Sequence, residues 1–369
     1  MVRFTVLASG SKGNSSIVSC TSGTGGSTRV LVDAGLSCRE LFRRMRLVGE
    51  DPSTLDAILV THEHQDHING LAVTARKLGI PVYFTEATHR AWVRQVTPQK
   101  RMTYAEWAQQ YREQKQAAEA AKTSSEPSHG ATDGEEAQSR DGEKPLSAAG
   151  YGLQPAHNTH ATSGALASEV CFSPAPEIDL RACADPNLPS EADAAEPKPD
   201  PARLPSVSYF RAGETFSIGD LSISPFTIPH DAADPVGFVF TAEGVRLAIA
   251  TDLGYMPPNV QAQLRRCDLI MLESNHDLEM LRDGPYPWSV KQRVLSRVGH
   301  LSNDAASAFL EEVYDGTATH LILAHLSESN NLPELARLAA ERALVSKPNL
   351  LANRLYLASQ DEPLDPVCF

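Results

Sequence analysis

The stretch VTHEHQDHING, residues 60–70, constrains this 369-residue chain more than any other segment. It follows an apolar run and supplies three imidazoles and a carboxylate within six residues: His62, His64, Asp66 and His67. Imidazole nitrogens and carboxylate oxygens are ligands for Zn²⁺, Mn²⁺ and Fe. Residues two apart in an extended segment project the same way, so His62 and His64 can reach one ion. Asp66 and His67, at the start of a helix, point to a second ion; the alternative is a polar turn with incidental histidines.

Two ions need further ligands, and the second half of the chain has candidates where strand-like runs end. They are His230 in SPFTIPHDAADP, Asp252 in VRLAIATDLGY and His325 in HLILAHLSESN. Taken alone, each has a structural explanation, as a capped strand end or a hydrogen-bonded core imidazole. Together with the first motif they predict a complete dinuclear site. Asp231 and Glu273 are candidates for orienting ligand imidazoles, or else solvated turn acids.

Short β-rich runs alternate with helix-like segments from residue 1 to about residue 97. We expect strands at 4–7, 17–20, 30–32, 57–60 and 82–84, and helices at 39–48, 68–78 and 87–96. Strand-like sequence returns at 207–210, and helices are expected at 290–298, 303–314 and 333–345. Two β-rich halves, each followed by helices, predict an α/β domain of two sheets with helices on their outer faces.

The segment 105–203 differs in composition from both flanks. It is rich in Ala, Glu, Pro, Ser and Gly, as in TSSEPSHGATDGEEAQSRDGEKPLSAAG. Such a segment buries too little apolar surface to offset the entropy lost on ordering. We therefore expect a first half of the domain at 1–104, a largely disordered insertion at 105–203 that begins with a polar helix, and the second half at 204–369.

The net charge of −13 neither excludes nor suggests a phosphate-rich substrate, because residues 99–205 carry −7 of it. No apolar run approaches the length of a membrane span, so no membrane association is expected. The first residues, MVRFTVLASGSKG, lack the features of a signal peptide. Six scattered cysteines without a CxxC pair predict free thiols in a reducing compartment. We expect a cytoplasmic protein.

The chain resembles the metallo-β-lactamase superfamily, and within it the YycJ/WalJ branch of bacterial proteins related to the RNase J and RNase Z nucleases. The resemblance rests on VLASGSKGNSSIV, VLVDAGLS, ILVTHEHQDHINGL, PHDAADPVGFVF, ATDLGY, ESNHD, GPYPWSVKQRVLSRVGHLSN and LAHLSESNN. It implies an αββα sandwich and 5′-exonuclease activity on DNA. It assigns one ion to His62, His64 and His230, the other to Asp66, His67 and His325, with Asp252 bridging. The long insertion departs from the family pattern.

The leading hypothesis is a metal-dependent hydrolase, a 5′→3′ exonuclease on single-stranded DNA. The ligand types suit two ions of Zn or Mn, and also Fe. The two ions would lower the pKa of a shared water towards about 7, and the resulting bridging hydroxide would attack phosphorus in line. Two alternatives stay open. One is a hydrolase of a thioester, a lactam or a small phosphodiester, and the other is a non-catalytic regulatory protein. The insertion is a candidate for recruiting a protein partner.

Further residues are candidates for contacts with the substrate. The catalytic candidates are Asp66, His276 and His300, and the phosphate-binding candidates are Ser11, Asn14, His300, Ser302 and Asn303. His276 would contact the scissile phosphate or protonate the leaving oxygen. His300, Ser302 and Asn303 would form an anion pocket at a helix N-terminus, whereas simple helix capping by Ser302 is the alternative. Tyr286 and Trp288 are candidates for base stacking or for packing.

Overall fold

The computed structural model describes residues 1–23, 25–97, 104–123, 200–345 and 354–369. The chain divides into two compact units: Met1–Gln99 with Lys198–Phe369, and Lys100–Pro197. The described part of the second unit is helix α5 (Tyr104–Thr123), which confirms the polar helix predicted at the start of the insertion. The rest of the predicted disordered insertion, residues 124–199, lies outside the described residues.

The first unit contains two seven-stranded sheets. The first sheet has the order β14-β1-β2-β3-β4-β5-β6, with β1 (Val2–Ala8), β2 (Ser15–Thr21), β3 (Ser27–Val32), β4 (Ala57–Leu59), β5 (Val82–Phe84), β6 (Val207–Tyr209) and β14 (Val367–Cys368). The second has the order β13-β12-β11-β10-β9-β8-β7, with β7 (Phe216–Ile218), β8 (Leu221–Thr227), β9 (Val236–Ala242), β10 (Val245–Ala250), β11 (Leu269–Glu273), β12 (His320–Ala324) and β13 (Leu355–Leu357).

Side chains alternate between two cores along the strands, as the period of two in a β-strand requires. In β3, Val30 and Val32 belong to the core between the two sheets, whereas Leu31 packs with the helices. In β12, Ile322 faces the core between the sheets and Leu321 packs with the helices on the other side. Both faces of both sheets are therefore covered, which explains the near-continuous apolar runs in the sequence.

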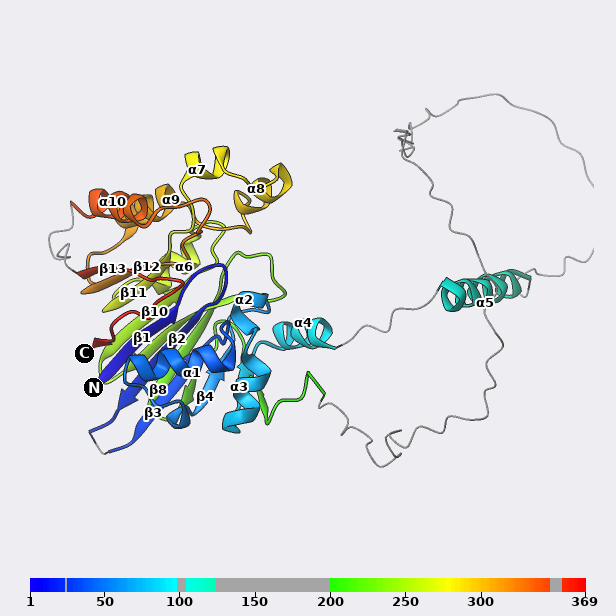
Figure 1. Cartoon of the computed structure of the whole chain (residues 1–369), viewed down its shortest axis with the longest axis horizontal. Coiled ribbons are helices and arrows are strands. Elements are labelled where there is room, and N and C mark those ends of the chain that lie inside the picture. The colour runs from blue at the N-terminus through cyan, green and yellow to red at the C-terminus, as the bar shows by residue number, and fades with distance from the viewer. Residues whose placement is uncertain (24, 98–103, 124–199, 346–353) are drawn as a thin grey trace, which may run out of the picture. The chain divides into compact units, whose positions relative to one another are not determined.

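Helices cover the outer face of each sheet, and Figure 1 shows α1 and α3 on the first sheet and α9 and α10 on the second. The first set is α1 (Cys38–Leu47), α2 (Gln65–Ile68), α3 (Leu71–Leu78) and α4 (Glu86–Val96), with a short 3₁₀ turn at Pro52–Thr54. The second is α6 (Pro258–Gln263), α7 (Leu278–Asp283), α8 (Trp288–Val294), α9 (Asn303–Ala308), a π-helical turn at Phe309–Val313, and α10 (Pro333–Leu344). The four layers confirm the predicted αββα sandwich.

The two sheets do not coincide with the two halves of the chain. Strand β6, which follows the insertion, pairs in parallel with β5, and β14 pairs antiparallel with β1. Both strands thus complete the first sheet from the second half of the sequence. The predicted bounds of the insertion remain a prediction, although Arg76 of α3 already donates a hydrogen bond to the carbonyl of Arg203 at 3.0 Å.

The predicted helix at 68–78 is interrupted between α2 and α3. A Cβ atom at Gly70 would lie 2.0 Å from the carbonyl oxygen of Leu36, so only glycine allows this close backbone approach. The break depends on a contact between segments far apart in the sequence, which helical periodicity cannot reveal.

The described cysteines are free thiols, as predicted: Cys20, Cys38 and Cys267 are buried and Cys368 is exposed. The other two predicted thiols, Cys171 and Cys183, lie outside the described residues. Among the helices that the structure describes, none has both the length and the apolar character needed to cross a bilayer.

Candidate metal centre

The seven predicted ligands meet at one rim of the sandwich, because each follows a strand there or begins a helix. They are His62 and His64 after β4, Asp66 and His67 in α2, His230 after β8, Asp252 after β10 and His325 after β12. The carboxyl ends of neighbouring parallel strands lie at the same edge of a sheet. Because β10 and β12 both run parallel to β11, the segments after them reach the same rim.

Two of these ligands and one neighbouring residue have a left-handed backbone conformation. The φ angle is 63° at Asp252, 56° at His325 and 59° at Asp33. A non-glycine residue in this region costs about 1–2 kcal/mol, and such residues concentrate at functional sites. Each lies within two residues of the end of a strand, where the sharp turn directs the chain along the rim.

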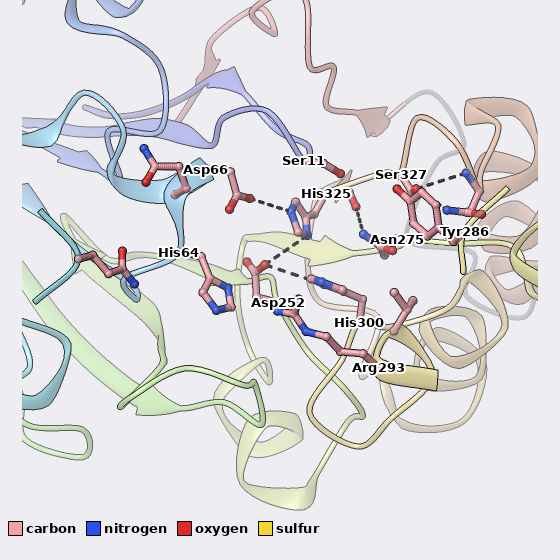
Figure 2. Close-up of a pocket in the computed structure, with 14 residues that line it drawn as sticks. Ser11, His64, Asp66, Asp252, Asn275, Tyr286, Arg293, His300, His325 and Ser327 are labelled. Carbon is pink, nitrogen blue, oxygen red and sulfur yellow. Dashed lines mark hydrogen bonds and ion pairs between the residues drawn. The ribbon is translucent and has the colours of Figure 1, made fainter. Parts of the chain in front are cut away.

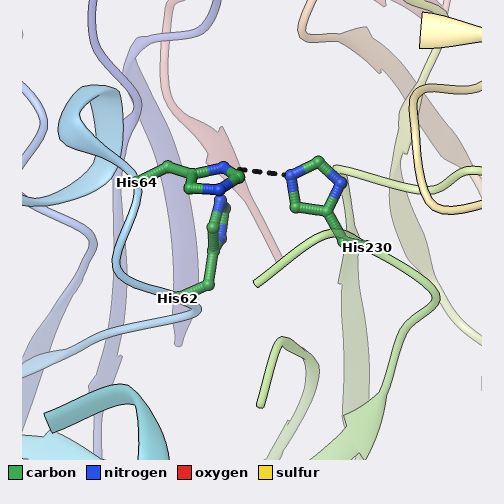
Figure 3. A group of neighbouring side chains, drawn as sticks. All are labelled: His62, His64 and His230. Atoms are coloured by element: carbon green, nitrogen blue, oxygen red, sulfur yellow. Dashed lines mark hydrogen bonds between the residues drawn. The ribbon is translucent and has the colours of Figure 1, made fainter. Parts of the chain in front are cut away.

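His62, His64 and His230 form the first group of potential ligands (Figure 3). Their ligand nitrogens all lie within 4.8 Å of one another, and His64 Nδ1 is 3.1 Å from His230 Nε2. His230 Nδ1 lies 3.0 Å from the carbonyl oxygen of Gly299. Because a carbonyl only accepts, Nδ1 carries the proton and Nε2 presents its lone pair to the group.

His62 is held in the same tautomer by a chain of hydrogen bonds. The hydroxyl of Thr61 donates to Asp33 at 2.8 Å and lies 3.0 Å from Nδ1 of His62. Since the single hydroxyl proton goes to Asp33, His62 Nδ1 must be the donor to Thr61. The Nε2 lone pair of His62 is therefore free for a ligand.

Asp66, His67 and His325 form the second group, again with ligand atoms within 4.8 Å of one another. Asp66 Oδ2 lies 3.4 Å from His67 Nε2 and 3.5 Å from His325 Nε2. Asp252 lies between the two groups, with Oδ2 at 3.5 Å from His67 Nε2 and Oδ1 at 4.0 Å from His230 Nε2. A carboxylate in this position fits the predicted bridging role.

Several buried atoms of the cluster have no hydrogen-bond partner within the described ranges of the chain. They are His62 Nε2, His325 Nε2 and Asp252 Oδ2. A buried polar atom without a partner costs about 1–3 kcal/mol, and a cation that takes these lone pairs removes that cost. Ligands made only of nitrogen and oxygen suit Zn²⁺, Mn²⁺ and Fe. The residues present therefore fit divalent metal ions.

The charges of the cluster agree with this fit. Burial alone would lower the pKa of His67, but the carboxylates of Asp252, Asp66 and Asp33 outweigh it and raise the pKa well above its ordinary value. Burial is outweighed at His325 as well, chiefly by Asp252 and Asp66, and its pKa is also raised. The carboxylates thus stabilise positive charge at this place, and divalent cations provide it.

Known proteins resemble both the sequence and the fold. A family model described as the β-lactamase superfamily domain matches residues 28–162 and 182–326. The exodeoxyribonuclease YycJ of Bacillus anthracis is 30% identical over 349 residues, which are 94% of this chain and 90% of that protein. The chain belongs to the β-lactamase superfamily, in the branch of YycJ and WalJ. The exodeoxyribonuclease WalJ of Streptococcus pneumoniae serotype 2 (strain D39 / NCTC 7466) is 26% identical, over 91% of this chain and 86% of that protein.

Two solved structures share the β-lactamase superfamily fold. The metallo-β-lactamase fold protein YhfI of Bacillus subtilis aligns with a TM-score of 0.52 and 13% identity, over 98% of both chains. Zn²⁺-bound PqqB of Methylobacterium extorquens aligns with a TM-score of 0.51 and 14% identity, over 98% of this chain and 99% of that chain. These likenesses confirm the fold class. Membership of the superfamily implies divalent metal ions at the cluster.

Asp33 also belongs to the site, although it was not among the residues predicted from the sequence. Its side chain is buried; Oδ2 accepts from His67 Nδ1 at 2.8 Å, and Oδ1 accepts from the backbone N–H of Thr61 at 2.8 Å. Asp33 therefore holds His67 with Nε2 towards Asp66. The available signal was the acid directly after the apolar run in VLVD, the same pattern that identified Asp252.

Replacing Asp33 by asparagine is expected to weaken metal binding by about 10–100-fold, the usual effect of losing a carboxylate that orients a ligand imidazole. The single oxygen of the new amide cannot accept from both the backbone N–H of Thr61, which bonds Oδ1, and His67 Nδ1, which bonds Oδ2. Competition with a chelator of known affinity measures the change. Asp56→Asn, at the opposite end of β4, is the matched control. Metal affinity unchanged in Asp33→Asn would contradict the orienting role.

Glu273 and Asp231, the predicted orienting acids, contact the imidazoles of the cluster. Glu273 Oε1 accepts from His300 Nδ1 at 2.8 Å and from His325 Nδ1 at 2.9 Å. Asp231 Oδ1 lies 3.5 Å from His230 Nε2, while its Oδ2 accepts from the guanidinium of Arg293. Glu273 thus orients two imidazoles, and Asp231 connects the first ligand group to a basic side chain.

A cavity of about 380 Å³ lies over the cluster (Figure 2). Four of the seven predicted ligands line it: His64, Asp66, Asp252 and His325. The remaining lining residues are mostly polar: Ser11, Gln65, Gln95, Asn275, Tyr286, Arg293, Val294, His300, Ser327 and Asn330. Figure 2 shows Arg293 and His300 near Asp252, with Ser11 next to His325. The cavity has the size of a small-ligand site, and its lining is more polar than is usual for one.

Of the predicted substrate residues, Ser11 and His300 line this cavity. Ser302 accepts a hydrogen bond from the backbone N–H of Ala305 and so caps α9. The amide of Asn14 donates to Asp66 Oδ2 at 2.9 Å. The predicted phosphate contacts of these side chains stay predictions.

Asn303 and His276, two other predicted substrate residues, are almost completely buried. Asn303 accepts a hydrogen bond from the hydroxyl of Ser274 at 2.6 Å. His276 is not among the residues that line the cavity, and burial lowers its pKa to about 4. Neither ring nitrogen of His276 has a hydrogen-bond partner among the described residues. Their roles at the substrate also stay predictions.

Proposed function

We propose that the protein is a dinuclear metal-dependent phosphodiesterase that degrades single-stranded DNA in the 5′→3′ direction. The observation that carries the proposal is the convergence of two groups of imidazole and carboxylate ligands around Asp252. Two relatives of the chain, YycJ and WalJ, are named exodeoxyribonucleases. The direction of degradation and the preference for single strands come from the sequence resemblance.

One ion is assigned to His62, His64 and His230, and the other to the second group, with Asp252 shared. Zn²⁺ or Mn²⁺ fits the ligand set, as does Fe. Such ions supply Lewis acidity and lower the pKa of water, which provides a nucleophile at neutral pH. The protein's part is to hold each imidazole in the tautomer that directs its lone pair at the ion, as Asp33 does for His67.

The wall of the cavity is suited to binding a phosphodiester. Arg293 brings a guanidinium to the wall, and a guanidinium forms strong charge-assisted hydrogen bonds with phosphate oxygens. His300 and Ser11 add an imidazole and a hydroxyl at the same cavity. These three side chains would bind and orient the phosphate over the cluster.

Polar and charged lining favours this substrate class over the thioester or lactam alternative. No apolar acyl-binding surface is evident among the described residues that line the cavity, which include Arg293, His300 and several hydroxyl and amide side chains. A purely regulatory protein would not need to keep a complete set of metal ligands.

We place the protein in the cytoplasm because its described cysteines are free thiols. Recruitment of a partner by the insertion stays a prediction.

The test uses single-stranded DNA with a 5′-phosphate and a fluorophore at its 3′ end, incubated with the protein and Mn²⁺. We expect labelled products that shorten progressively from the 5′ end, and no products from the Asp66→Ala/His67→Ala variant. Immediate release of a single labelled nucleotide would contradict the direction. Intact DNA together with hydrolysis of bis(4-nitrophenyl) phosphate would contradict the DNA substrate and favour a small phosphodiester.

A further inference from the structure

One wall of the metal cavity is formed by residues 286–298, which comprise α8 and the residues on either side of it; we call this segment the α8 wall. Tyr286, Arg293 and Val294 of the α8 wall line the cavity. Figure 2 shows Tyr286 on the side of the cavity opposite His64 and Asp66, whereas Arg293 extends towards Asp252. In Figure 1, α7 and α8 project beyond the strands of the second sheet. The α8 wall thus continues outwards from the proposed site.

The α8 wall is fixed to the metal ligands at its C-terminal end. The carbonyl of Val298 accepts from the backbone N–H of Asp231 at 3.0 Å, and the next carbonyl, of Gly299, accepts from His230 Nδ1. A Cβ atom at Gly254 would lie 2.2 Å from the carbonyl oxygen of Arg297, so the loop after Asp252 packs directly against the α8 wall. A surface anchored in this way keeps its position relative to the cluster.

The outer surface of the α8 wall exposes large apolar side chains. Trp288 is 66% exposed, Leu295 50% and Val298 44%. Exposed apolar side chains that occur singly need no explanation, but three within one short segment, other residues of which line the cavity, point to a binding surface. An indole this exposed also offers a flat face for stacking.

The charge of the α8 wall identifies the partner. Residues 286–298 contain no Asp or Glu and include the exposed side chains of Arg293 and Arg297, in a chain whose net charge is −13. Lys291 is buried and donates to the carbonyl of Arg282, so it adds no charge to this surface. The guanidinium of Arg297 lies over the ring of Tyr255, 4.4 Å from its centroid. Exposed aromatic side chains interspersed with basic ones form the surface that single-stranded nucleic acids bind, by base stacking and phosphate contact.

We propose that the α8 wall binds the single strand that extends from the scissile phosphate, with a base stacked on Trp288 and phosphates at Arg293 and Arg297. This proposal rests on the proposed function, since it extends the same site to a longer substrate. Nucleic acid is favoured over a protein partner because the α8 wall contributes Tyr286, Arg293 and Val294 to the cavity and contains no acidic residue of its own. The carboxylate of Asp231, outside the α8 wall, pairs with Nε of Arg293.

The test measures the binding of dT12 with phosphorothioate linkages, which resist cleavage, to the metal-loaded protein. Intrinsic tryptophan fluorescence and anisotropy of a labelled strand are both recorded. We expect dT12 to quench the fluorescence, and Trp288→Ala to raise Kd by about 5-fold or more, the usual loss when one stacked base loses its platform. Trp288→Phe should keep Kd within about twofold, because an aromatic face is retained, but it should lose most of the quenching.

Trp107→Ala is the matched control, since Trp107 is 51% exposed in α5; its Kd should equal that of the wild type. Because Trp288 is exposed, the melting temperature of its variants should not change. A Kd unchanged in Trp288→Ala, or a wild type that does not bind dT12, would overturn the proposal. If Trp288→Ala weakens binding but the wild type degrades no DNA, the α8 wall proposal stands and the exonuclease proposal fails. If the wild type degrades DNA but Trp288→Ala binds dT12 as tightly as the wild type, the exonuclease proposal stands and the α8 wall proposal fails.

Discussion

Replacing Asp252 by asparagine is expected to lower kcat/KM for DNA cleavage by about 10³-fold or more. Asp252 belongs to two of the potential ligand groups and lies between His67 and His230, so its charge serves both proposed ions. Stabilisation of transition-state charge by metal ions contributes several kcal/mol, and about 4 kcal/mol corresponds to about 10³-fold in rate. The amide keeps the size of the side chain but loses the negative charge that the ions require.

The rate of DNA cleavage and the metal content of the same protein sample check this prediction. Asp268→Asn is the matched control, because Asp268 accepts a hydrogen bond from the backbone N–H of Arg246 at 2.8 Å, which an asparagine can also accept. The control should retain wild-type activity. An Asp252→Asn protein with wild-type kcat/KM would contradict the bridging role.

Replacing Glu273 by glutamine is expected to lower the free energy of unfolding by about 3–5 kcal/mol, the usual effect of breaking a buried ionic network. Glu273 is fully buried and accepts four hydrogen bonds, from His300, His325, and the backbone N–H groups of Leu253 and Leu301. Burial alone would raise its pKa, but the two imidazoles hold the pKa at about 2. In the variant, the amide NH₂ must face one pair of these donors.

Chemical denaturation of the metal-loaded protein measures the loss, and chelator competition measures metal affinity in parallel. Metal affinity should fall by about 10–100-fold, because His325 loses its orienting partner. Glu279→Gln is the control, since Glu279 is an exposed side chain in the first turn of α7. If Glu273→Gln unfolds at the same denaturant concentration as the wild type, Glu273 does not hold the cluster together.

The residues that meet in the candidate metal cluster could be predicted from sequence because each one carries a local signal. THEHQDH places four of them in one turn, and Asp252 and His325 each follow an apolar run. A residue after a buried strand lies at the rim of a sheet wherever that strand is placed in the sheet. The αββα class could be predicted for a similar reason, because the apolar runs and helix-like segments in both halves indicate sheets covered on their outer faces.

Features that depend on contacts between distant segments could not be predicted. Gly70 interrupts a helical pattern because the backbone of Leu36 passes close to it, and no local rule gives that distance. Strand β6 joins the first sheet across the insertion. Asp33 becomes a site residue only when the first sheet brings it beside Thr61 and His67.

The predicted phosphate-binding residues illustrate a second limit. The signature of a helix N-terminus in HLSND correctly indicated the start of α9, and Ser302 caps it. Whether a cap also faces a cavity depends on how the helix is oriented, and the structure places Asn303 in a buried network with Ser274 and Asn331. Arg293 reaches the cavity wall from a segment whose sequence pattern indicated only a helix.

The presence of two metal ions is tested most directly by anomalous diffraction from crystals grown with Mn²⁺ or Zn²⁺ and measured at the absorption edge of the metal. We expect two anomalous peaks, one among His62, His64 and His230, and the other among Asp66, His67 and His325, with the Asp252 carboxylate between them. A single peak, or peaks away from these side chains, would contradict the dinuclear site on which the proposed phosphodiesterase activity depends.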